Sequence, residues 1–225
     1  MNHFDVAIIG LGPAGSMAAL LLESYGMKVL CIDKEKDIYN LPRAVTVSDQ
    51  GFRMSQLAGI DDIYLKNSTI LGGAYFSDKN LEIIGGSIDL KGYISANGWP
   101  ASSLFHQPYT DRDIRDKLEN SSVEIILENE FISLDQNQES VSFKTINLNN
   151  QEENEFTSRY LIGSDGGSSV VRKQLGISQE DLNYNRDWVV IDVELNEPDK
   201  LGDKLIQVCD KERLATFVPS HLPFR

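Results

Sequence analysis

A glycine-rich turn near the N-terminus constrains the fold of this chain more than any other feature. The turn, Gly10-Leu11-Gly12-Pro13-Ala14-Gly15, follows an apolar segment (4–9) and opens a segment with helical periodicity (13–25). A second apolar segment (28–32) comes next and is followed directly by Asp33. The order of strand, glycine turn, helix, strand and acid predicts a βαβ unit that binds the pyrophosphate and ribose of a dinucleotide.

Each residue type in the turn has a physical reason. Gly10 permits a tight turn, Gly12 lets backbone N–H groups approach phosphate oxygens, and Gly15 lets the helix lie close to the strand. Pro13 suits the first helical position, where its missing N–H costs nothing. The helix N-terminus then offers unsatisfied N–H groups to the phosphates, and Asp33 is expected to accept hydrogen bonds from the ribose hydroxyls. The turn alone does not separate FAD from NAD.

The first helix is expected to end at Gly26, a typical C-terminal stop. Apolar residues at helical spacing predict that one stripe of this helix is buried: Ala14, Met17, Ala18, Leu21, Leu22 and Tyr25. The uncharged segment 6–22 is not a signal peptide, because it lacks a basic region before it and is interrupted by glycine and proline. No other stretch approaches the length of a membrane span.

The composition limits the possible partners. The chain has 225 residues, of which 41% are hydrophobic and 24% are charged, as is typical of a globular protein. A net charge of −13 repels nucleic acid, so no nucleic-acid partner is expected. Cys31 and Cys209 have neither metal nor disulfide spacing and the three histidines are scattered, so no metal site is expected. We expect structural thiols and a cytoplasmic location.

Local patterns predict the further elements. Ser48 is expected to cap a helix, Thr110 and Asp113 form the spacing of a capping box, and residues 72–98 carry the short apolar runs of a second, sheet-rich layer. The expected helices are 48–57, 110–118 and 169–175, and the expected strands are 123–127, 131–134, 141–146, 156–163, 187–195 and 214–218. Trp99 and Trp188 are interpreted as packing residues.

Four further motifs accompany the glycine turn and Asp33. They are Leu41-Pro42-Arg43-Ala44-Val45 before Ser48-Asp49, Phe105-His106-Gln107-Pro108, the segment from Gly163-Ser164-Asp165-Gly166-Gly167 to Arg172, and Trp188-Val189-Val190-Ile191-Asp192-Val193. With these motifs, the chain resembles the FAD-dependent aromatic hydroxylases of the para-hydroxybenzoate hydroxylase type (class A flavoprotein monooxygenases). Within them it is most similar to the 3-(3-hydroxyphenyl)propionate hydroxylase-like proteins. The resemblance covers essentially the whole chain.

The resemblance implies an α/β fold, in which a Rossmann-like FAD-binding domain of the glutathione-reductase type is joined to the beginning of a β-rich substrate domain. The implied parts are 1–72 and 104–180 for the FAD-binding domain, 73–103 for a β-rich excursion, and 181–225 for the start of an incomplete substrate-binding sheet.

The resemblance also implies roles for individual residues. The ADP half of FAD is assigned to Gly10, Gly12, Pro13, Ala14, Gly15, Asp33 and Lys34. Arg43 is assigned to the FAD diphosphate or ribityl region, where a guanidinium can pair with phosphate, and Gln107 to the flavin-proximal backbone. Asp165 and Gly166 are expected near the cofactor, in a motif that also serves the nicotinamide donor. No residue is assigned a catalytic role.

The implied reaction is the hydroxylation of a small phenolic substrate in aromatic catabolism. In this family NAD(P)H reduces FAD, and the reduced flavin reacts with O₂ to give a C4a-hydroperoxide that hydroxylates the ring. The protein positions the ring and excludes water. The sequence leaves open the identity of the substrate, the choice between NADH and NADPH, and the oligomeric state.

The resemblance also implies that the chain is an N-terminal portion. Proteins of the family are considerably longer and carry a further Gly-Asp motif and most of a substrate sheet, so we expect weak FAD binding and no turnover without a C-terminal portion or a second polypeptide. Three alternatives stay open. They are a nicotinamide-dependent Rossmann dehydrogenase, a non-catalytic flavin-binding module, and another enzyme of the flavin fold such as a halogenase or a geranylgeranyl-reductase-like protein.

Overall fold

The computed structural model describes residues 3–197 and 202–220. The chain divides into two units, each made of two segments. The first unit is Met1–Tyr39 with Asp111–Arg186, and the second is Asn40–Thr110 with Asp187–Arg225. Helices and strands alternate along the first part of the chain, and the predicted α/β fold class is confirmed.

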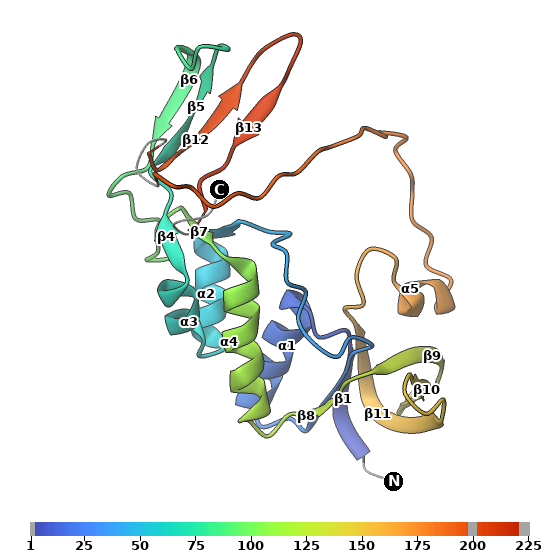
Figure 1. The fold of residues 1–225 in the computed structure, drawn as a ribbon. Helices are drawn as coiled ribbons and strands as arrows, with labels where there is room; N and C mark the ends of the chain where they lie inside the picture. The colour runs from blue at the N-terminus through green and yellow to red at the C-terminus, as the bar shows by residue number, and fades with distance from the viewer. Residues whose placement is uncertain (1–2, 198–201, 221–225) are drawn as a thin grey trace. The chain divides into compact units, whose positions relative to one another are not determined.

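The first unit is built on a six-stranded sheet with the strand order β8-β2-β1-β11-β10-β9. Five of these strands, β8, β1, β11, β10 and β9, are labelled in Figure 1. Strands β8, β2, β1 and β11 pair in parallel, whereas β10 pairs antiparallel with both β11 and β9. The bounds of these strands are β1 His3–Ile9, β2 Val29–Ile32, β8 Glu124–Ile126, β9 Asn129–Gln136, β10 Val141–Asn147 and β11 Glu153–Gly163. The predicted strand pair β1–β2 and the predicted β9–β10 hairpin are therefore confirmed.

Two helices belong wholly to this unit, α1 (Pro13–Ser24) and α5 (Val170–Gln174). Helix α1 begins at Pro13 as predicted and connects β1 to β2, which completes the βαβ unit. Helix α5 is capped by Ser169, whose side chain accepts a hydrogen bond from the N–H of Arg172. The sequence therefore located both helices.

The predicted buried stripe of α1 is wrong. The buried residues are Gly15, Ser16, Ala19 and Leu20, whereas Tyr25 is 68% exposed. Nearly every residue of α1 is apolar or small, so the periodicity does not single out one face. The small residues face inward because they let the helix lie close to β1 and β2.

The core of the first unit lies around its central strands. Apolar residues of β1 and β2 pack with residues of the hairpin and of α5. The fully or nearly fully buried members of this cluster are Phe4, Ala7, Ile9, Leu30, Ile32, Phe131, Phe143 and Val171. This packing fixes the strand ends from which the glycine turn leaves the sheet.

The second unit contains two smaller sheets. The first has the order β3-β7-β4 and the second has the order β13-β12-β5-β6. The strands are β3 Thr46–Ser48, β4 Ser68–Ile70, β5 Gly73–Ser77, β6 Ile83–Asp89, β7 Ser102–Phe105, β12 Lys204–Val208 and β13 Ala215–Phe217. Strand β12 joins the sheet by pairing in parallel with β5, although it lies far along the chain.

Helices α2 (Asp49–Leu57) and α3 (Asp61–Lys66) accompany these sheets, and α4 (Gln107–Glu119) begins in the second unit and ends in the first. Helix α2 is confirmed with its predicted cap, because Ser48 Oγ accepts a hydrogen bond from the N–H of Gly51 at 3.2 Å.

The predicted capping box at Thr110 is wrong. Helix α4 already begins at Gln107, and Thr110 Oγ1 donates to the carbonyl oxygen of His106 at 3.3 Å.

The predicted strand 187–195 does not form. Residues 187–193 pair with no strand in the described part of the chain, and four consecutive apolar residues, Trp188, Val189, Val190 and Ile191, are 71–85% exposed. The expected packing role of Trp188 is therefore wrong, whereas Trp99 stacks on Phe52 with ring centroids 4.9 Å apart. A strand-like alternation still needs a neighbouring strand to satisfy its backbone groups.

Candidate cofactor site

Three segments of the first unit meet at one edge of its sheet. Gly10 follows β1, Asp33 follows β2, and Ser164 follows β11. The three strands are parallel, and Ile9 lies opposite Ile32 on one side and Gly163 on the other. Ligands of open α/β sheets bind at this carboxyl edge, so the topology brings together the first-unit residues predicted to hold the cofactor.

Gly10 and Gly15 are required by close packing. Gly10 has φ +98°, and a Cβ there would lie 2.5 Å from the carbonyl oxygen of Ser164. A Cβ on Gly15 would overlap the carbonyl oxygen of Gly10 and lie 2.7 Å from Ser164 Oγ. Both glycines therefore let β1, α1 and the Ser164 segment come together.

Gly12 has a different surrounding. A Cβ on Gly12 would meet no atom within 4 Å, and Gly12, Pro13 and Ala14 are all exposed at the N-terminus of α1. The space beside the first turn of the helix is therefore open. A helix N-terminus carries backbone N–H groups without partners inside the helix and the positive end of the helix dipole, so this exposed terminus fits a diphosphate such as that of FAD.

Asp33 lies beside the turn with both carboxylate oxygens in hydrogen bonds. Its Oδ2 accepts from the N–H of Leu11 at 2.5 Å, and its Oδ1 accepts from the N–H of Glu35 at 2.8 Å. Each carboxylate oxygen can accept more than one hydrogen bond, so Asp33 can still receive ribose hydroxyls. Lys34, the next residue, is exposed.

Asp165 caps helix α5. Its carboxylate accepts hydrogen bonds from Ser169 Oγ at 2.5 Å and from the N–H groups of Val170 and Val171 at 2.6 and 3.1 Å. Burial raises the pKa of Asp165, but these hydrogen bonds outweigh burial and hold the pKa below its ordinary value. Asp165 and the exposed Gly166 thus lie in a loop that is already ordered, and their contact with a cofactor stays a prediction.

Sequence reasoning missed the role of Ser164 at this edge. The motif that contains Ser164 predicts no partner for its side chain. Its Oγ donates to the carbonyl oxygen of Gly10 at 2.7 Å and lies 3.0 Å from that of Ile9. The available signal was a small hydroxyl residue directly after a strand that pairs with β1.

Arg43 and Gln107 belong to the second unit. The side-chain oxygen of Gln107, a buried residue, accepts hydrogen bonds from the N–H groups of both Arg43 and Ala44 at 2.8 Å. Gln107 therefore holds the backbone of the loop that presents the exposed Arg43. Their predicted contacts with FAD stay predictions.

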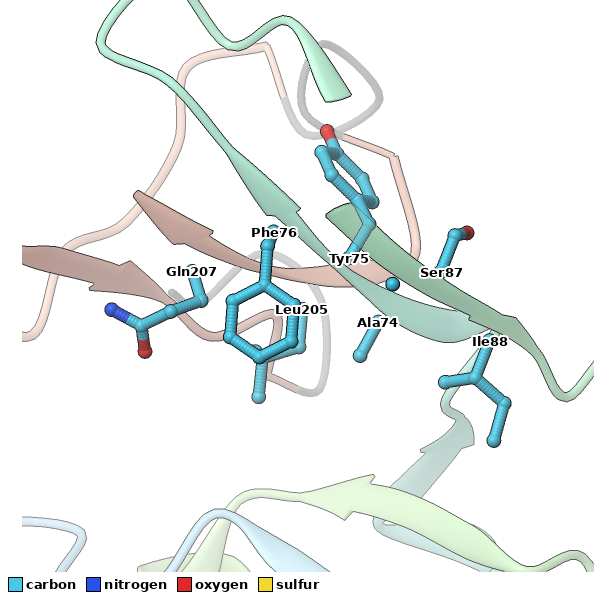
Figure 2. Close-up of a pocket in the computed structure, with 8 residues that line it drawn as sticks. Ala74, Tyr75, Phe76, Ser87, Ile88, Leu205 and Gln207 are labelled. Atoms are coloured by element: carbon cyan, nitrogen blue, oxygen red, sulfur yellow. The ribbon is translucent and has the colours of Figure 1, made fainter. Parts of the chain in front are cut away.

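The second unit also carries a pocket of about 270 Å³ on the sheet β13-β12-β5-β6. Figure 2 shows Ala74, Phe76, Ile88 and Leu205 pointing to one side of this sheet, with Tyr75 pointing to the other. The side of the sheet that carries Phe76 and Ile88 is lined mainly by apolar side chains. It is also open, because Phe76 is 49% exposed and Ile88 is 53% exposed. Such a surface suits a flat apolar group better than a charged one.

The described residues include no candidate metal centre, and one of their two cysteines is buried. Within them, no group of three or more His, Cys, Asp or Glu side chains is placed to hold a metal ion. Burial raises the pKa of Cys31 to about 12, so this thiol stays protonated in the core. None of the helices in the same residues combines the length and the apolar character that a membrane crossing requires.

Curated proteins that are similar to this chain include hydroxylases. A 3-(3-hydroxy-phenyl)propionate/3-hydroxycinnamic acid hydroxylase of Burkholderia cenocepacia is 30% identical over 99% of this chain and 40% of its own length. A probable NADH-specific resorcinol 4-hydroxylase of Rhodococcus jostii is 28% identical over 92% of this chain and 39% of its own length. The chain thus spans about 40% of the length of these curated relatives.

Solved structures share the fold. The p-nitrophenol 4-monooxygenase PnpA of Pseudomonas putida is similar over 100% of this chain and 57% of its own, with a TM-score of 0.82 and 19% identity. Aklavinone-11 hydroxylase in complex with FAD and aklavinone is similar over 100% of this chain and 46% of its own, with a TM-score of 0.79 and 18% identity.

The FAD binding domain family matches residues 3–221, a range that includes both the open turn at Gly12 and the loop held by Gln107. The chain therefore belongs to the FAD binding domain family, and the cofactor of that family is FAD.

Proposed function

We propose that this chain is the FAD-binding part of an NAD(P)H-dependent monooxygenase that hydroxylates a phenolic ring. The observation that carries the proposal is the open space beside Gly12 at the N-terminus of α1, with Asp33 at the end of the neighbouring strand. When bound, FAD supplies the redox chemistry with O₂ that the side chains of this chain do not. The similarity to hydroxylases of phenolic acids and of resorcinol supports this reaction class.

Individual residues are proposed to bind and orient the cofactor. The N–H groups at Gly12 and Ala14 bind the diphosphate, and Asp33 accepts hydrogen bonds from the ribose. Arg43 pairs with a phosphate or approaches the ribityl chain, while Gln107 fixes the backbone of the Arg43 loop. Asp165 and Gly166 lie in a preformed loop beside Gly10 and approach the cofactor from the end of β11.

The sheet of the second unit is proposed to receive the aromatic substrate. Residues 73–103 and 181–225 then belong to the substrate-binding part, and residues 1–72 and 104–180 to the FAD-binding part. The parallel pairing of β5 with β12 supports the grouping of the first two segments, because it places both in one sheet. The open apolar face with Phe76 and Ile88 would exclude water from one side of a ring.

A further polypeptide portion is proposed to complete the enzyme. The exposed apolar segment 188–191 supports this, since four consecutive apolar side chains in water are unfavourable. A portion equivalent to the remaining length of the hydroxylases, on the same or a second polypeptide, would cover it. On this proposal the 225-residue chain binds FAD weakly and does not turn over by itself.

The test is a titration of the purified chain with FAD, followed by flavin fluorescence and visible absorbance, beside titrations with NADH and NADPH. Saturable binding of FAD, with no binding of NADH or NADPH, supports the proposed cofactor site. A well-folded chain that prefers NAD(H) to FAD would instead support a nicotinamide-dependent dehydrogenase. Robust NADPH oxidation by the chain alone would contradict the need for a further portion.

A further inference from the structure

The peptide bond between Gly10 and Leu11 is held on both sides. Its carbonyl oxygen, that of Gly10, accepts a hydrogen bond from Ser164 Oγ at 2.7 Å. Its N–H, that of Leu11, donates to Asp33 Oδ2 at 2.5 Å. The two side chains come from the ends of β11 and β2, the strands that flank β1.

Ser164 is itself firmly placed. Its backbone N–H donates to the carbonyl oxygen of Ile9 at 2.8 Å, and its Oγ is 3.0 Å from that same oxygen. The Oγ also fills the space beside Gly15, where a Cβ would lie 2.7 Å away. The serine side chain is thus enclosed by the glycine turn, and its hydroxyl points into it.

The orientation of this peptide bond controls the turn that follows. Gly10 adopts φ +98° and lacks a side chain, so its own backbone offers little resistance to rotation of the Gly10–Leu11 peptide. The residues that face the open space, from Gly12 to Ala14, come directly after it. A rotation of the peptide would therefore redirect the N–H groups that face a bound diphosphate.

We propose that Ser164 is a positioning residue for the diphosphate site. Together with Asp33 it fixes the Gly10–Leu11 peptide before the cofactor arrives, so that binding does not have to order the turn. Asp33 then has two tasks, because the carboxylate that is expected to meet the ribose also holds the turn. The inference rests on the proposed binding of FAD at Gly12.

The first experiment compares Ser164→Ala with a matched control, Ser158→Ala. Ser158 is a buried serine on β11, the strand that leads to Ser164, and its Oγ donates to the carbonyl oxygen of Tyr160 at 2.8 Å, away from the turn. Both variants lose one serine hydrogen bond and are compared by thermal unfolding without ligand. Binding of ADP and of FAD is then measured by calorimetry and by flavin fluorescence.

We expect Ser164→Ala to weaken ADP and FAD binding equally, by about tenfold, because ADP contains the part that contacts the turn. Ser158→Ala should change neither affinity by more than about twofold, since it lies away from the site. Equal affinities in Ser164→Ala and the wild-type chain would overturn the inference. A loss that merely follows thermal stability in both variants would overturn it as well.

The second experiment needs no ligand. Amide hydrogen exchange by NMR should show that the Leu11 N–H of the wild-type chain exchanges at least about a hundredfold more slowly than an unstructured amide. Rapid exchange at Leu11 would overturn the inference, even if Ser164→Ala failed to fold. Slow exchange in a chain that binds neither ADP nor FAD would leave the preformed turn standing and would contradict the proposed function instead.

Discussion

The carbonyl oxygen of Gly10 occupies the space that a Cβ atom on Gly15 would need. Gly12, between them in the same motif, borders open space on the side where its Cβ would lie. The glycines of one short turn therefore serve two purposes. Gly15 is required for the packing of α1, whereas Gly12 is proposed to give access to a ligand, and substitution of each by alanine separates the two roles.

Gly15→Ala should destabilise the ligand-free chain by about 1–3 kcal/mol, because the new methyl group overlaps backbone. Gly12→Ala should change this stability by less than about 1 kcal/mol, since it only alters the N-cap of α1. The same substitution should weaken FAD binding strongly, because the new methyl group enters the open space proposed for the diphosphate. Urea unfolding and flavin absorbance check the two expectations. Equal loss of stability in both variants would contradict this division of roles.

Replacement of Gln107 should loosen the Arg43 loop. Gln107→Met keeps a similar volume but leaves the N–H groups of Arg43 and Ala44 without that acceptor, at a cost of about 1–3 kcal/mol. Limited proteolysis should then cut the loop faster than in the wild-type chain. Gln56→Met is the control, because the Gln56 side chain accepts an exposed hydrogen bond from Arg53. Unchanged cleavage in Gln107→Met would show that other contacts hold the loop.

The two cysteines should differ sharply in reactivity. Cys31 is buried, and burial raises its pKa to about 12, whereas Cys209 is exposed. The native chain should therefore react at one thiol with a reagent such as Ellman's, and at both after denaturation. Because the pKa of Cys31 is raised on folding, the stability this thiol contributes is present below pH 9 and is lost as pH rises toward 12. A Cys209→Ser variant that still reacts rapidly would contradict the buried placement.

Acid should weaken the cap of α5. The pKa of Asp165 is lowered on folding, so this residue contributes stability above its ordinary pKa, and the contribution is lost as pH falls through the lower folded value. Asp165→Asn should therefore reduce the fall in urea midpoint below about pH 4. Asp135→Asn, an exposed change of the same charge near the end of β9, is the control. Equal acid profiles in the two variants would rule out this role for Asp165.

The two tryptophans should report on separate environments. Trp188 is 80% exposed, whereas Trp99 stacks on Phe52. Acrylamide should quench one red-shifted component of the fluorescence, and Trp188→Phe should remove it. Addition of the C-terminal portion of the Burkholderia hydroxylase should shift this component to the blue if that portion covers 188–191. A blue, poorly quenched Trp188 in the isolated chain would mean that another contact already buries it.

Local patterns were enough to predict the βαβ unit. The turn at Gly10, the start of α1 at Pro13 and the position of Asp33 all depend on neighbours within a short stretch of chain. The same holds for the Ser48 cap of α2 and the hairpin of β9 and β10. In each case the residue type has one dominant local preference, and the tertiary structure agrees with it.

The failures arose where a local preference was ambiguous or needed a distant partner. Helix α1 is apolar nearly all round, so only its packing decides that Ala19 is buried and Tyr25 is not. The Thr110–Asp113 spacing suits a cap, but the helix had already begun at Gln107. The alternation after Trp188 predicted a strand, yet alternation supplies no hydrogen-bonding neighbour. The role of Ser164 depends on a contact with Gly10 that no local pattern encodes.

The contact between Ser164 and Gly10 joins positions 154 residues apart in sequence. During synthesis at about 5–20 residues per second, the serine follows the glycine by on the order of ten seconds. The glycine turn, although it lies near the start of the chain, therefore cannot reach its final geometry until most of the first unit has left the ribosome. Long-range contacts of this kind also slow folding. We therefore expect capture of the proposed cofactor to be a late event in the biogenesis of this protein, and a nascent chain cut short before β11 to lack a formed diphosphate site.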